Sequence, residues 1–323
     1  MKKTGLLLIL CLAVVAQGQQ AAPAADQSSP QGTVATNVNF PTEQIATPTR
    51  SDLYCAGFVN KDLLPNASYV AGGLDTPSTA QYSDSREVLY LTGKSYEVGK
   101  LYTVVRELRD PNRFESFDGQ FAMLKAMGYP YAELATVKVI DTRNKMAIAH
   151  IELACSPVVP GDTVVPYVDK SSVTFHPPMH FDRFAPANNK LSGRIVMAKD
   201  FDSELGTGMK VYLNLGANQG VKVGDYFRAV RSYEADLHNP VDSLSFKAST
   251  AEDTQAKQPS IDQKMFTKTN GPVIHVADFP RRAVGEIVVV STTPTTSTGM
   301  IVFALEDMHL GDGVELDQQN AAQ

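Results

Sequence analysis

The run Lys210-Val-Tyr-Leu-Asn-Leu-Gly-Ala-Asn-Gln-Gly-Val-Lys-Val-Gly-Asp-Tyr-Phe-Arg-Ala-Val-Arg231 decides how the chain folds. Apolar residues on both sides of a glycine-containing centre predict a strand, a turn and a second strand. Gly220 and Gly224 allow the positive φ that a tight reversal needs. Val221 can tuck under the turn, and Asp225 can accept backbone N–H bonds. Gly220, Gly224 and Asp225 are therefore predicted to be structural.

A weaker copy of this pattern lies upstream. When Gly99 is aligned with Gly224, Arg106 falls on Arg231. The later parts match in the same order: residues 135–154 with 287–304, Gly161 with Gly311, and Asp162 with Asp312. These glycines and aspartates are likewise predicted to shape turns. The sequence therefore predicts a mainly β protein with two repeated small β-barrel-like domains, each interrupted after its arginine strand.

The predicted organisation has six parts. They are a signal peptide at 1–18, a disordered leader at 19–51, a β-domain at 52–170, a proline-rich linker at 171–189, a second β-domain at 190–317 with a long insertion at 236–278, and a tail at 318–323. The first domain is expected to open with a strand at 52–59 and a polar loop at 60–85. One short helix is expected within the first insertion, over Gly119–Gly128.

The N-terminus has the pattern of a secretion signal. Lys2 and Lys3 precede an apolar run that ends near Ala16. The run is shorter than the roughly 20 residues that span a bilayer. Cys11 follows Leu10 inside the run, whereas lipidation needs a cysteine after a small residue at its end, so a lipoprotein is the lesser alternative. We expect a periplasmic or secreted protein without a membrane span.

Composition restricts the partners. The chain has 29 Lys and Arg against 35 Asp and Glu, a net charge of −6, and no tryptophan. An acidic chain without a basic block argues against nucleic acid and against an anionic membrane surface.

The two cysteines that follow the signal, Cys55 and Cys155, lie near opposite ends of the first domain. In an exported protein this favours a disulfide, and two buried free thiols are the alternative.

Two constellations could carry chemistry. His176 and His180 have the four-residue spacing of zinc ligands, but the two intervening prolines prevent a helix from placing them on one face. Carboxylates in the first insertion could serve a glycosidase, and these are Asp110, Glu115 and Asp118. Metal binding and glycan hydrolysis are therefore alternatives, and no cofactor is expected.

The run from Val211 to Arg231, followed by Val284–Val290 and by Leu310-Gly-Asp312, resembles the C-terminal domain of flagellar assembly protein T. It also resembles the β-domain attached to LysM-type peptidoglycan-associated proteins of Gram-negative bacteria. The resemblance covers Leu191–Leu316, and a degenerate version covers Tyr54–Val168. It implies a β-barrel-like module that binds or scaffolds in the periplasm.

The expected function is that of an exported, non-catalytic binding or scaffolding protein of the cell envelope. Its partner is expected to be an envelope protein or peptidoglycan. The segment 236–278 is the expected partner-binding element, and Phe246, Met265 and Phe266 are its candidate anchors.

Overall fold

The computed structural model describes residues 46–75, 81–93, 96–173, 181–232 and 280–318. The predicted signal peptide, most of the leader, and the whole of the predicted insertion at 236–278 lie outside these residues. Both barrels belong to one compact unit of the chain.

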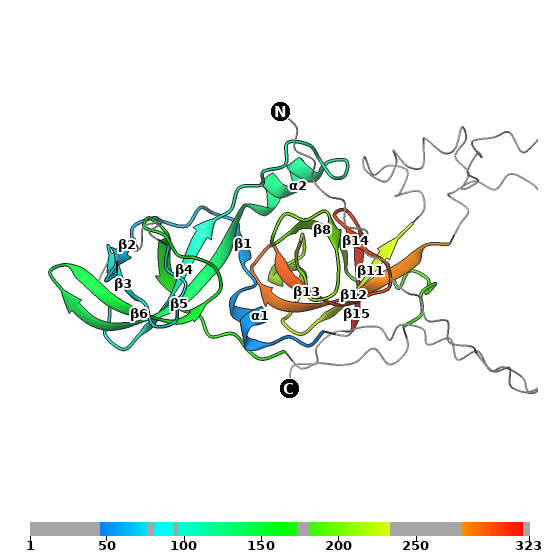
Figure 1. The fold of residues 1–323 in the computed structure, drawn as a ribbon. Helices are drawn as coiled ribbons and strands as arrows, with labels where there is room; N and C mark the ends of the chain where they lie inside the picture. The colour runs from blue at the N-terminus through cyan, green and yellow to red at the C-terminus, as the bar shows by residue number, and fades with distance from the viewer. Residues whose placement is uncertain (1–45, 76–80, 94–95, 174–180, 233–279, 319–323) are drawn as a thin grey trace, which may run out of the picture. The chain divides into compact units, whose positions relative to one another are not determined.

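The first barrel closes from six antiparallel strands, most of which are labelled in Figure 1. Its spatial order is β5-β4-β7-β2-β3-β6, and pairing between β5 and β6 closes it. The strands are β2 (Tyr69–Gly73), β3 (Val88–Thr92), β4 (Leu101–Glu107), β5 (Tyr129–Arg143), β6 (Met146–Ala154) and β7 (Thr163–Pro166). A seventh strand, β1 (Phe58–Asn60), pairs with the start of β5 outside the closed ring.

The second barrel also closes from six antiparallel strands, in the order β10-β13-β12-β11-β15-β8. Its strands are β8 (Ser192–Ala198), β10 (Lys210–Leu213), β11 (Tyr226–Arg231), β12 (Arg282–Thr292), β13 (Ser297–Ala304) and β15 (Gly313–Gln318). The short strands β9 (Glu204–Leu205) and β14 (Met308–His309) pair with each other. The prediction of a mainly β chain with two small barrels is confirmed.

The two barrels have the same strand order. Around the ring, the first barrel has the order β5, β4, β7, β2, β3 and β6. The second barrel has the order β12, β11, β15, β8, β10 and β13, so each strand of one barrel has a counterpart at the same place in the other. The turn bonds agree as well, because Gly99 N–H donates to Val139 O over 2.7 Å and Gly224 N–H donates to Val289 O over 2.8 Å. The internal repeat is therefore a repeat of architecture.

A bidentate ion pair recurs at the same place in each barrel. Arg106 Nε and Nη2 each lie 2.7 Å from one oxygen of Asp162. Arg231 makes the same two bonds to Asp312, also at 2.7 Å. Both aspartates are buried. Each pair ties the arginine strand to the turn before the last strand, so these residues stabilise the barrels.

The opening motif does not form a hairpin. β10 pairs with β8 and β13, whereas β11 pairs with β12 and β15. The connection between β10 and β11 therefore crosses an end of the barrel, and buried Val221 packs there against the core. Gly220 and Gly224 have φ of 90° and 89°. Asp225 is fully buried and accepts the Lys222 N–H over 2.8 Å.

Two expectations for the start of the first domain are wrong. Residues 50–54 form a helix, α1 (Arg50–Tyr54), because Thr49 and Asp52 make a capping box. Cys55 is therefore the C-cap of a helix and does not lie in a strand. The loop predicted at 60–85 contains β2, whose two terminal glycines lower its apparent strand propensity.

The second barrel is buried on both sides of its β12–β13 hairpin. Ile287 and Ile301 face the inner core. On the outer side, Val288, Val290, Met300 and Val302 pack in a second cluster with Leu53 and Tyr54 of α1. Residues of the segment after β7 also join this outer cluster: Tyr167, Val173 and Phe181. A near-continuous apolar run such as Val284–Val290 is typical of a strand covered on both faces.

Candidate functional site

The first insertion connects β4 to β5 and contains the one helix expected there, α2 (Gln120–Met127). Glu115 stabilises the start of this helix, since its carboxylate accepts the N–H groups of Gly119 and Phe121 over 3.2 and 2.9 Å. Gly128, with φ of 115°, ends it and returns the chain to β5.

This insertion leaves its own barrel and docks on the second one. The buried ring of Phe117 belongs to the second barrel's core cluster, and the guanidinium carbon of Arg194 lies 5.8 Å from the ring centroid. Gln120 is buried and donates from Nε2 to the Val196 carbonyl over 3.0 Å. A Cβ atom at Gly311 would lie 2.8 Å from Phe117 Cγ, so the ring needs a glycine beneath it. We call Arg194, Val196 and Gly311 the occupied seat.

The second barrel also holds the strand β1 through side-chain hydroxyls. Thr298 Oγ1 donates to the Gly57 carbonyl over 3.0 Å, and Thr296 Oγ1 donates to the Val59 carbonyl over 3.1 Å. Tyr212, which is fully buried, donates to the carbonyl of Ala56 over 3.1 Å. These bonds satisfy carbonyls on the side of β1 opposite β5 and fix the first barrel to the second.

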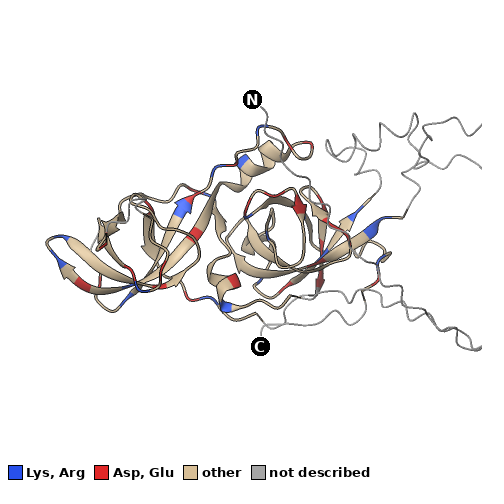
Figure 2. Ribbon diagram, in the orientation of Figure 1, with Lys and Arg blue, Asp and Glu red and all other residues tan. Residues whose placement is uncertain are grey.

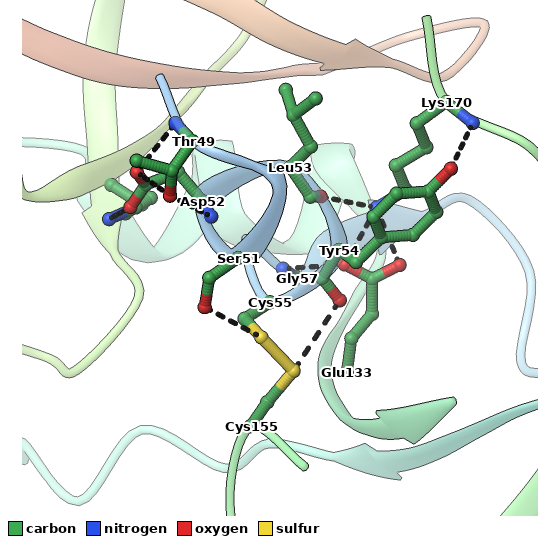
Figure 3. Close-up of a disulfide and its surroundings, with 11 residues drawn as sticks. Thr49, Ser51, Asp52, Leu53, Tyr54, Cys55, Gly57, Glu133, Cys155 and Lys170 are labelled. Atoms are coloured by element: carbon green, nitrogen blue, oxygen red, sulfur yellow. Dashed lines mark hydrogen bonds and ion pairs between the residues drawn. A yellow bond between two sulfur atoms is a disulfide. The ribbon is translucent and has the colours of Figure 1, made fainter. Parts of the chain in front are cut away.

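The helix α1 is fixed to the first barrel by a disulfide between Cys55 and Cys155, which confirms the predicted bridge. Figure 3 shows this bridge beside the Lys170 side chain, which bonds the carboxylate of Glu133 at 2.6 and 2.7 Å and the Leu53 carbonyl at 2.8 Å. Burial raises the pKa of the Glu133 carboxyl, and the Lys170 ammonium opposes this rise.

A charged cluster lies on the wall of the second barrel, where β11 pairs with β12 and β15. Figure 2 shows further basic residues at the end of β11 and the start of β12. Arg228 Nη2 lies 2.8 Å from Asp317, and Arg281 pairs with Glu315. Glu286 is buried among them, and one of its oxygens has no hydrogen-bond partner within the described chain. Burial raises the pKa of Glu286 to about 7; Asp317 adds to the rise, and Arg228 opposes it.

Two of the carboxylates considered for glycan hydrolysis accept hydrogen bonds from nearby backbone N–H groups. Asp110 accepts the N–H of Asn112, and Glu115 caps α2, so both hold local backbone. Asp118 is exposed beside the start of the helix. A shallow hollow elsewhere on the first barrel is lined by Asp84 and Glu152 together with Ser83, Ser85, Leu153 and Ala154. Within the described residues, no group of three or more His, Cys, Asp or Glu is arranged to hold a metal ion.

The remaining candidates lie outside the described residues. They are the possible zinc ligands His176 and His180 and the possible anchors Phe246, Met265 and Phe266. The structural turn residues lie where the repeat places them, since Gly161 and Gly311 both have φ of 98° directly before the clamped aspartates. In the part of the chain described here, no helix has both the length and the apolar character that crossing a membrane requires.

Sequence analysis missed the docked insertion. The available signal was the spacing of Gln120, Leu124 and Met127, which places three side chains on one side of a short helix, with Phe117 just before its start. Nothing in that pattern identifies which barrel the helix contacts. The fold and this insertion define a tandem of closed six-stranded barrels in which one barrel's insertion grips the other. Neither a comparison with protein-family models nor one with curated proteins gives a match for the chain.

Proposed function

We propose that this chain is an exported, non-catalytic binding or scaffolding protein of the bacterial cell envelope. The observation that carries the proposal is the first insertion, which docks on another barrel through Phe117 and Gln120. A connection used in this way is a binding element. The second insertion interrupts its barrel at the matching point, between β11 and β12, and its role is to bind a partner.

The anchors assigned to the second insertion are Phe246, Met265 and Phe266. Aromatic and methionine side chains are enriched in protein interfaces, where they bury large areas. The partner is an envelope protein or peptidoglycan. Export is supported by the basic and apolar N-terminus, and a periplasmic place by the resemblance to envelope β-domains. Export is tested by determining the first residue of the mature protein and the cell fraction in which the protein is found.

The function is tested by co-sedimentation of the oxidised, exported chain with purified peptidoglycan sacculi, together with crosslinking in intact cells. The expected result is retention on sacculi or reproducible capture of an envelope protein. A chain that lacks residues 236–278 should lose that interaction while it keeps its fold by circular dichroism. Binding that survives the deletion, or no binding by the intact chain in either assay, contradicts the proposal.

A subtler variant separates anchoring from loss of chain length. Serine at the three anchor positions, Phe246, Met265 and Phe266, should weaken the interaction as the deletion does. The matched control is Phe184→Ser, which removes an aromatic ring that is 60% exposed outside the insertion. The control should bind as the unchanged chain does.

A further inference from the structure

Equivalent backbone hydrogen bonds in the two barrels identify the surface of the first barrel that corresponds to the occupied seat. Val70 N–H donates to Asp162 O over 2.9 Å, and Ile195 N–H donates to Asp312 O over 3.0 Å. Four residues further along each strand, Leu74 N–H donates to Val88 O and Lys199 N–H donates to Lys210 O. Both strands carry an irregularity between these points. The equivalent positions are Tyr69 with Arg194, Ala71 with Val196, and Gly161 with Gly311.

On the second barrel the docked insertion contacts all three positions, and Arg194 itself is exposed. Arg194 lies over the Phe117 ring, Val196 is fully buried with its carbonyl bonded to Gln120, and Gly311 lies under the ring. This is the environment that a docked insertion creates.

On the first barrel the same three positions are open. A Cβ atom at Gly161 would meet nothing within 4 Å, whereas its counterpart at Gly311 would strike an aromatic ring. Tyr69 is 40% exposed, and Ala71 is exposed. Leu74, at the end of the same strand, is 62% exposed. We call Tyr69, Ala71 and Gly161 the open seat.

We propose that the open seat binds the second insertion, residues 236–278, of another copy of this chain, so that copies associate head to tail. The inference rests on the proposed function, in which the second insertion binds a partner, and it names that partner. The second insertion departs after Arg231, the counterpart of Arg106, and so starts from the same place on its barrel as the first insertion does.

The sequence of the second insertion supports this occupant. Within Phe117–Leu124, the first insertion has an apolar residue, then an Asp, then a Gln and then a pair of apolar residues. The second insertion places the same residue types in the same order within Ile261–Phe266. Its ends are separated by a longer segment than 108–128, so it has the reach to cross to a neighbouring barrel.

The contact between the barrels explains why the occupant comes from another copy. The first barrel contributes its insertion and the β1 strand beside β5, whereas the second contributes β8, β10 and β13. Different faces therefore meet, which is a heterologous contact. If the insertion of the second barrel docks in the same way, it must contact a third barrel. The first barrel of another chain, with its open seat, is that third barrel.

Sedimentation velocity on two complementary variants tests the arrangement. Ala71→Lys blocks the open seat, and deletion of 236–278 removes the occupant. Each variant alone should be monomeric, and their equimolar mixture should form a 1:1 complex, because one variant keeps its insertion and the other keeps its seat. The intact chain should show a mass that rises with concentration, and Ala71→Lys should weaken its association by about tenfold or more. Ile140→Lys, at a half-exposed site on β5, is the matched control.

A second readout does not depend on mass. Because the chain has no tryptophan, Tyr69→Trp introduces a single fluorophore at the open seat. Its emission should shift to the blue when the intact insertion is present at associating concentrations, and should stay unchanged when 236–278 is deleted. A chain that is monomeric at all concentrations, or a mixture that gives no complex, overturns the inference. If the intact chain still captures an envelope protein or sacculi in that case, the proposed function stands without it.

Discussion

Glu286 lies opposite Arg228 across the β11–β12 ladder, yet one oxygen of its carboxylate has no hydrogen-bond partner in the described chain. Arg228 is directed to Asp317 and also lies 5.7 Å from the Phe181 ring centroid. The second barrel therefore contains a buried carboxylate whose charge is incompletely compensated. Ionisation of this group opposes folding, and its consequence can be measured.

Stability should fall as pH rises from about 4.5 to about 7 and then level off. The pKa of Glu286 is raised to about 7 in the folded chain from 4.5, so the stabilising neutral form is fully present below about pH 4.5 and lost as pH passes 7. Glu286→Gln should raise the free energy of unfolding at pH 8 by on the order of 2 kcal/mol and leave it nearly unchanged at about pH 4. Urea unfolding at both pH values checks this. The exposed Glu152→Gln should change neither; equal effects of the two substitutions would contradict the assignment.

Loss of the disulfide should destabilise the chain strongly. The bridge joins residues 100 apart in sequence, for which the chain-entropy model gives about 4–5 kcal/mol. It also holds α1, which covers the outer cluster of the second barrel. The double variant Cys55→Ser with Cys155→Ser should therefore unfold at much lower urea concentration. Addition of a reductant should shift the parent chain to the same midpoint and leave the variant unmoved.

The two arginine clamps should differ in strength. The Arg231 side chain is 7% exposed and that of Arg106 is 40% exposed, while both partner aspartates are 4% exposed. Removal of the arginine leaves a buried carboxylate without its counterion. Arg231→Ala should therefore cost about 3–5 kcal/mol in urea unfolding, and Arg106→Ala should cost clearly less, because water reaches its clamp. The reverse order would show that exposure does not control the strength of the clamps.

Phe117 should control whether the first insertion stays docked. Phe117→Ala removes a buried ring from the occupied seat and should cost about 3 kcal/mol, with earlier proteolytic cleavage within 108–119. Phe114, three residues earlier, is 85% exposed. Phe114→Ala is therefore the matched control and should behave as the parent chain in both assays. Equal protease sensitivity of the two variants would mean that the ring does not hold the insertion.

Much of both barrels could be predicted from the sequence, because their turns need glycine or aspartate and few other residues can take those places. Gly99, Gly224 and the two clamped aspartates mark equivalent points in both copies. Strand β2 escapes prediction because its terminal glycines carry no side chain to show a pattern.

The joint between the barrels could not be predicted for a different reason. Several of its bonds run from side chains to backbone carbonyls, as from Thr298 to Gly57 and from Gln120 to Val196. Backbone carbonyls are present at every residue, so the sequence contains no sign of which one is used. The helix α1 was missed because its five residues are too few for a period, and only the Thr49 cap marks it.

The ring order has a consequence for the order of events during synthesis. In each barrel the last strand made, β7 or β15, fits between two strands made much earlier, β4 and β2 or β11 and β8. Until it arrives, the nascent sheet has two unpaired edges that can recruit other chains. Closure also joins distant parts of the chain, which makes it slow. Each barrel therefore passes through an open, aggregation-prone state that a chaperone could protect until the final strand is made.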